Sequence, residues 1–137
     1  MRILFDINVV LDVLLNRSPW VAEAQSLWDA VAQRKLDGYL APTTITTIYY
    51  LSRKLPGGDV AGRRAVSACL STFQICPIDG TTLSQALAMT GPDFEDDVQI
   101  ACAVQSSLNG IVTRNPADFK GAPCRVYSPG ELLAALP

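Results

Sequence analysis

Short apolar runs alternate with helix-forming segments along the whole chain, and this alternation restricts the fold more than any other feature. The first run, residues 2–5, ends at the carboxylate Asp6, which is the pattern of a buried parallel strand. Further strands are predicted at 39–41, 73–78, 111–113 and 125–127. Strands that alternate with helices form a parallel sheet covered on both faces. The sequence therefore predicts one α/β domain over residues 1–137, with three α/β/α layers around a central parallel sheet.

Proline, glycine and capping residues indicate where the helices begin and end. Ser18 and Pro19 are expected to begin a helix that stops before Gly38, and Pro42 is expected to begin the next one. Ser128 and Glu131 have the spacing of a capping box for a last helix. The remaining helices are predicted at 9–15, 59–70, 81–89 and 95–108.

The chain contains no histidine. This absence excludes Ser-His-Asp and Cys-His triads, HExxH zinc sites and two-histidine nuclease mechanisms. The cysteines form no Cys-x-x-Cys pair, so we interpret them as small buried apolar side chains in a reducing compartment. They are Cys69, Cys76, Cys102 and Cys124. Chemistry in this chain is therefore expected to use oxygen ligands.

Acidic residues follow two of the predicted strands and begin one predicted helix. Asp6 follows the first strand, and Asp118 comes shortly after the strand at 111–113. The acids at the start of the helix at 95–108 are Asp93, Glu95, Asp96 and Asp97. In an open parallel sheet the ligand crevice lies beyond the carboxyl ends of the strands, so these groups are expected to converge there. Converging carboxylates repel unless a cation lies between them, and hard oxygen ligands suit Mg²⁺ or Mn²⁺.

Each acidic segment also has a purely structural interpretation. Asp6 can cap the helix that follows it, although Asn8 is an alternative cap. The acids at 93–97 can complement a helix dipole, and Asp118 can be an ordinary turn residue after an Asn-Pro pair. The metal-site hypothesis depends on all three segments reaching one edge of the sheet.

Three segments resemble the signature blocks of PIN domains, the fold of VapC-type toxins. They are residues 5–12 (Phe-Asp-Ile-Asn-Val-Val-Leu-Asp), 93–101 (Asp-Phe-Glu-Asp-Asp-Val-Gln-Ile-Ala) and 112–119 (Val-Thr-Arg-Asn-Pro-Ala-Asp-Phe). The resemblance covers essentially the whole chain and is to a branch with an Asp-Phe-Glu-Asp motif. It implies a metal-dependent endoribonuclease in which Asp6, Asp96 and Asp118 hold Mg²⁺ or Mn²⁺. The supporting polar residues near the metal would be Asn8, Thr113 and Asn115.

One position departs from the family pattern. Thr47 stands where many PIN domains carry a glutamate, and a hydroxyl is a weaker metal ligand than a carboxylate. Glu95, next to Asp96, is expected to supply the missing charge. The predicted catalytic and metal-binding set is thus Asp6, Glu95, Asp96 and Asp118. Arg114 is a candidate phosphate contact.

Three functions remain open from the sequence. The resemblance implies the toxin of a VapBC-type toxin–antitoxin system, which cleaves single-stranded or looped RNA with metal-activated water. A PIN-like RNA- or protein-binding module with weak or no activity is the second, because of Thr47. The third is a phosphoacceptor signalling domain in which Asp79 receives phosphate and Thr113 senses it.

Composition and the family resemblance bear on partners and location. A hydrophobic content of 49% is high for a soluble protein and favours an apolar interface such as that of an oligomer. The resemblance to VapC-type toxins implies that the partners are a second copy of the chain, in a homodimer, and a cognate antitoxin. A net charge of −2 provides no global positive field, so RNA contact must come from local basic clusters. The sequence has no secretory signal pattern and no stretch of 18 uncharged apolar residues, which predicts a cytoplasmic protein without membrane contact.

Overall fold

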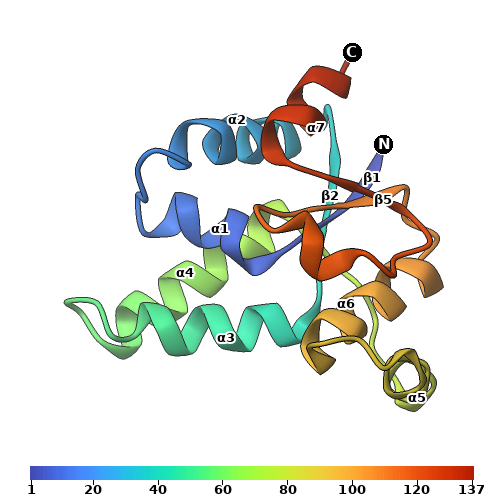
Figure 1. Cartoon of the computed structure of the whole chain (residues 1–137). Helices are drawn as coiled ribbons and strands as arrows, with labels where there is room; N and C mark the ends of the chain where they lie inside the picture. Colours follow the sequence, from blue (N-terminus) through green and yellow to red (C-terminus); the bar gives the residue numbers. More distant parts are fainter.

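Five parallel strands form the centre of the computed structural model, which describes residues 1–137 (Figure 1). The strands are β1 (Arg2–Phe5), β2 (Asp37–Leu40), β3 (Gln74–Ile75), β4 (Gly110–Val112) and β5 (Arg125–Tyr127). They lie in the order β3-β2-β1-β4-β5, and every neighbouring pair is parallel. The predicted parallel sheet is confirmed, with β1 at its centre.

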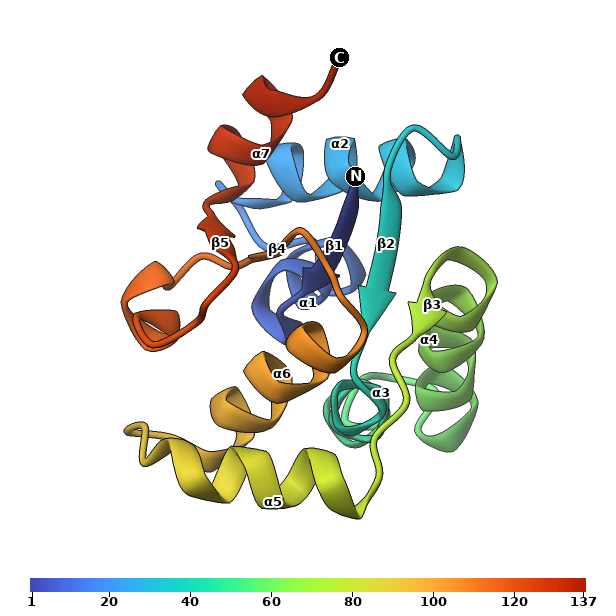
Figure 2. The same cartoon turned by 90° about the vertical axis from the view of Figure 1, so that its right-hand side faces the viewer.

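Helices connect the strands and cover both faces of the sheet (Figure 2). They are α1 (Ile7–Leu14), α2 (Val21–Ala32), α3 (Pro42–Ser52), α4 (Asp59–Thr72), α5 (Gly80–Met89), α6 (Phe94–Gln105) and α7 (Pro129–Ala135), with a short 3₁₀ helix η1 (Pro116–Phe119). None of them combines the length and the hydropathy that a membrane span needs.

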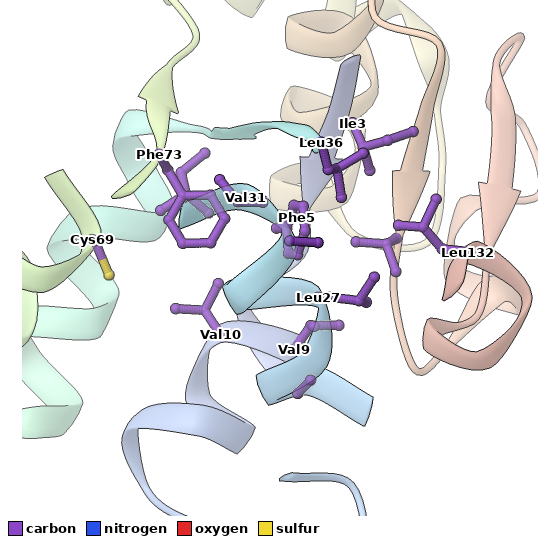
Figure 3. Close-up of a cluster of buried hydrophobic side chains, with 14 of the residues drawn as sticks. Ile3, Phe5, Val9, Val10, Leu27, Val31, Leu36, Cys69, Phe73 and Leu132 are labelled. Atoms are coloured by element: carbon purple, nitrogen blue, oxygen red, sulfur yellow. The ribbon is translucent and has the colours of Figure 1, made fainter. Parts of the chain in front are cut away.

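Alternate side chains of β1 enter different parts of the core, which explains why its sequence is continuously apolar. Ile3 and Phe5 pack in a cluster with side chains of α1, α2, α4 and α7 (Figure 3). Leu4, between them, packs in a second cluster with side chains of α6 and with Phe119 of η1. A strand that is buried on both faces needs apolar residues at every position. The three predicted α/β/α layers are therefore present.

The predicted start and stop of α2 are wrong. Residues 18–20 form a turn, in which the N–H of Val21 donates to the carbonyl of Arg17, and the helix begins only at Val21. It ends at Ala32, and Gly38 lies within β2 instead. A Cβ atom at Gly38 would come within 2.7 Å of both Phe73 and Val31. The glycine thus permits close packing against the strand and does not stop the helix.

The strand predicted at 73–78 is much shorter than expected, because only Gln74 and Ile75 pair with β2. Asp79, a few residues later, caps α5 by accepting a hydrogen bond from the N–H of Thr82. The predicted capping box of Ser128 and Glu131 at α7 is confirmed.

All the cysteines are free, as predicted. Cys69, Cys76 and Cys102 are buried, and Cys124 is half-buried. They act as small core side chains.

Candidate active site

Asp6 follows β1 and accepts hydrogen bonds from three donors. Its Oδ1 accepts from the N–H of Ile7 at 2.8 Å and from Nε2 of Gln99 at 3.3 Å. Its Oδ2 accepts from Oγ1 of Thr113 at 2.7 Å. Asp6 therefore does cap α1, and it also joins β1 to α6 and to the end of β4. Burial raises the pKa of this carboxyl, its hydrogen bonds oppose part of that rise, and the charge of Asp118 adds to it.

A polar network fixes the loop that follows β4. Thr113 is fully buried, and its hydroxyl accepts from Nδ2 of Asn8 at 3.3 Å and from the N–H of Asn115 at 3.0 Å. Together with its bond to Asp6, this uses one donor and two acceptor positions, which is the full capacity of a hydroxyl. Oδ1 of Asn8 accepts from the N–H of Arg114 at 3.3 Å. The predicted supporting residues thus lie together around Asp6.

The acidic residues at the start of α6 have different roles: one caps the helix, and the others have free carboxylates. Asp93 caps the helix by accepting from the N–H groups of Glu95 at 2.8 Å and Asp96 at 3.3 Å. The carboxylates of Glu95 and Asp96 make no hydrogen bond within the chain. Partial burial raises the pKa of Asp96 to about 7, and the charges of Asp6 and Asp118 are among those that add to the rise.

The pKa of Glu95 is raised too, first by loss of hydration and then by the charges of Asp93 and Asp6. Asp118 lies on η1 and is exposed, while the next residue, Phe119, is 1% exposed and anchors η1 in the core. The carboxyls predicted from the sequence therefore act on one another electrostatically. Asp6 and Asp118 follow the carboxyl ends of β1 and β4, and the charge of Asp6 acts on Glu95 and Asp96 at the start of α6.

Asp97 has a different surrounding from its neighbour Asp96. It is 6% exposed, and its Oδ2 accepts from the N–H of Gly91 at 2.9 Å. Asp97 therefore fixes the loop between α5 and α6 rather than contributing to the acidic site.

Gln99 was not predicted as a site residue. Its side chain is 1% exposed, and its amide donates to Asp6, while its Oε1 has no hydrogen-bond partner. Gln99 stands three residues after Asp96 on α6, which places the two side chains on the same face of the helix. That spacing is the signal in the sequence that could have indicated it.

Arg114 lies beside a buried acid. Its Nε is 3.1 Å from Oδ2 of Asp12, which is fully buried on α1, and its guanidinium lies 4.1 Å from the ring centroid of Trp20. Burial raises the pKa of Asp12, and the positive charge of Arg114 opposes that rise. The guanidinium thus compensates Asp12, and a phosphate contact by Arg114 stays a prediction.

The sequence model of the PIN domain family matches residues 2–117. The chain belongs to the PIN domain family. No curated protein matches its sequence. The acidic residues described above thus lie in a PIN domain, and a branch defined by the Asp-Phe-Glu-Asp motif stays a prediction.

Solved structures show the same fold. The chain is similar to VapBC2 from Rickettsia felis, solved bound to a DNA fragment from its promoter, with a TM-score of 0.72, 13% identity, and 93% of this chain and 98% of that chain covered. It resembles a toxin–antitoxin complex from Klebsiella pneumoniae with a TM-score of 0.68, 23% identity, and coverage of 92% and 96%. VapC20 from Mycobacterium tuberculosis, a toxin that cleaves the sarcin-ricin loop, matches with a TM-score of 0.69, 14% identity, and coverage of 90% and 96%.

Thr47 of this PIN domain is half-buried on α3, and its Oγ1 donates to the carbonyl of Thr43 at 3.1 Å. Its hydroxyl is therefore satisfied by its own helix. Helix α3 carries no acidic residue. Every candidate carboxylate therefore comes from Asp6 at the end of β1, from α6 or from η1.

The side chains as placed do not form a ready metal cage. No three Asp, Glu, Cys or His side chains lie close enough together to hold an ion. The donor set nevertheless fits Mg²⁺ or Mn²⁺, because it consists of carboxylate oxygens and of the unpartnered Oε1 of Gln99. Burial and, after it, the charges of neighbouring acids raise the pKa of Asp96, and a bound cation would oppose that rise.

Proposed function

We propose that this PIN domain is a metal-dependent endoribonuclease, the toxin of a VapBC-type toxin–antitoxin pair in the cytoplasm. The observation that carries the proposal is the group of carboxylates beyond the ends of β1 and β4, where burial first, and the charges of Asp6, Asp93, Asp118 and Glu95 in addition, raise the pKa of Asp96 to about 7. Structural burial alone does not account for it, because the charges of neighbouring acids contribute. Perturbed carboxyls in one cluster are typical of functional sites.

The residues have distinct parts in this proposal. Asp6, with both oxygens already oriented, provides a fixed ligand position, while Glu95, Asp96 and Asp118 have free oxygens that can turn toward a cation. Thr113 and Gln99 orient Asp6 through its two oxygens. A divalent ion held there would supply neutralisation of the scissile phosphate and activation of water.

The proposed partners follow from the neighbouring structures. VapBC2 and the Klebsiella protein were solved in toxin–antitoxin complexes, and VapC20 is a toxin that cleaves the sarcin-ricin loop. We therefore include a cognate antitoxin and single-stranded or looped RNA in the proposal. The homodimer is included because of the high apolar content of the chain.

A second candidate is a PIN domain that binds RNA or protein without cleaving it. Thr47 favours this function, because α3 contributes no carboxylate to the acidic site. It predicts RNA binding without cleavage in any divalent metal.

One cleavage assay tests both candidates. Purified protein is incubated with single-stranded RNA in Mg²⁺, in Mn²⁺ and in excess EDTA, with Asp96→Asn as the control for a contaminating nuclease. We expect cleavage by the wild type only with metal, and almost none by the variant. Equal cleavage in EDTA would contradict the metal-dependent function, and no cleavage under any condition would favour the second candidate.

A further inference from the structure

A pocket of about 470 Å³ adjoins the acidic site and shares Asp118 with it. Its walls come from the loop between α5 and α6, from α6 itself, and from η1 with the segment that follows. Figure 2 shows this loop and η1 at the same end of α6. Pockets of this volume commonly hold small organic groups.

The pocket has an apolar wall. Met89 comes from the end of α5, Pro92 from the loop between α5 and α6, the buried Ile100 from α6, and Pro123 from the segment after η1. Flat and aliphatic surfaces of this kind can pack against the face of a nucleobase. No aromatic or basic residue other than Lys120 lines the pocket.

The walls are fixed before any ligand arrives. The bond from the N–H of Gly91 to Asp97 holds the α5–α6 loop, and a Cβ atom at Gly91 would collide with that carboxylate. Phe119, fully packed in the core, holds η1 on the other side. A preformed pocket loses less entropy on binding than a mobile one.

Charge indicates what the pocket would hold. Lys120 lines it, is exposed and forms no ion pair within the chain, so its ammonium is free to bind an anion. Two carboxylates also line the pocket: Asp118, which belongs to the acidic site, and Asp97, whose Oδ2 already accepts from the N–H of Gly91. A ligand that reaches from Lys120 to the acidic site at Asp118 needs a phosphate near Lys120 and an apolar ring against the apolar wall. A nucleotide has both groups.

We propose that this pocket binds one nucleotide of the RNA strand, next to the phosphate at the acidic site. The base packs against the apolar wall, and Lys120 binds a phosphate of the same strand. This inference rests on the proposed function, since it assigns part of the substrate of that site.

The first test fills the pocket. Gly121 lines it, and a Cβ atom there would meet no atom within 4 Å, so the first carbon of the side chain in Gly121→Leu has open space. Gly80 at the start of α5 is equally unobstructed and lies outside the pocket, so Gly80→Leu is the matched control. The readout is the affinity for a fluorescent single-stranded RNA in EDTA, where binding is measured without cleavage. We expect about tenfold weaker binding for Gly121→Leu, the scale of one stacked base, and wild-type affinity for the control.

The second test removes the positive charge and does not depend on how Gly121→Leu folds. Lys120→Ala should weaken RNA binding and lower the slope of log affinity against log salt by about 1, because one phosphate contact is lost. Lys35→Ala, in the exposed segment before β2, should leave that slope unchanged. Free mononucleotide is the third arm, and it should compete only weakly because it lacks the strand that reaches Asp118.

The two proposals fail separately. Wild-type RNA affinity in both Gly121→Leu and Lys120→Ala would show that the pocket does not bind a nucleotide, even if the protein cleaves RNA with metal. A protein ligand would then be the alternative occupant of the pocket. Competition by mononucleotide as strong as that by RNA would overturn the assignment to a strand. Absence of cleavage in the preceding assay would contradict the nuclease while leaving this binding test intact.

Discussion

Asp6 and Asp96 face the same site, yet the protein holds them in opposite ways. Asp6 is 5% exposed, and donors from Ile7, Gln99 and Thr113 occupy both of its oxygens. Asp96 has no hydrogen-bond partner for its side chain, and its surroundings raise its pKa to about 7. In the proposed metal site, Asp6 would therefore be a rigid ligand and Asp96 a responsive one. A site of this kind can be oriented before metal arrives and still adjust to it.

The largest expected effect tests the responsive ligand. Asp96→Asn should reduce metal-dependent RNA cleavage at least 100-fold, the upper range for a defect at a metal site. Asp97→Asn makes the same chemical change one residue further along α6, where an amide oxygen can still accept from Gly91. It should keep cleavage within a few-fold of the wild type. Equal losses in single-turnover rate would mean that the two acids do not differ as described.

The next prediction tests the rigid ligand through Gln99. Gln99→Leu removes a donor to Asp6 and should weaken Mn²⁺ binding about tenfold, as losing an outer partner of a metal ligand does. Gln105→Leu, at the other end of the same helix, is the control. The side-chain carbonyl of Gln105 accepts from the hydroxyl of Thr82, and its amide makes no bond to Asp6. Isothermal titration with Mn²⁺ measures both. Equal affinities for the two variants would show that Asp6 is oriented without Gln99.

The smallest effect concerns stability without metal. A carboxyl whose pKa rises from 3.8 to about 7 on folding binds more protons in the folded state between these values. The free energy of unfolding should therefore fall as pH rises from about 4 to about 7. Asp96→Asn should flatten this fall and melt a few degrees above the wild type at pH 7.5 in EDTA. Thermal melts across this pH range test it, and parallel curves for the two proteins would contradict the raised pKa.

Much of the fold was predictable from the sequence because its signals are local. The apolar run of β1, the Pro42 start of α3 and the capping box at Ser128 depend on neighbouring residues, and all three predictions are confirmed. The error at Pro19 is local, because residues 18–20 form a turn closed by the bond from Val21 to Arg17, whereas the error at Gly38 comes from tertiary contacts. Gly38 is required by packing against Phe73 and Val31, which lie outside its own helix or strand.

The acidic site was predicted from the same logic, since strand ends and a helix start bring Asp6, Asp96 and Asp118 to one edge. Gln99 was missed because its only sequence signal is its spacing of three residues from Asp96, and the bond from its amide to Asp6 joins segments far apart in the chain. The sequence also does not indicate that Asp97 fixes the α5–α6 loop, because its hydrogen-bond partner Gly91 lies in that loop and not in α6.

The most direct test of the central claim is whether Asp6 and its neighbours hold a divalent ion. Melting of the wild type and of Asp6→Asn is followed with and without Mn²⁺ at a hundredfold excess over Kd. Binding to the folded state should stabilise the wild type by about 2.7 kcal/mol, and the variant by much less. An equal gain in both proteins would mean that Asp6 only caps α1, and it would contradict the metal site.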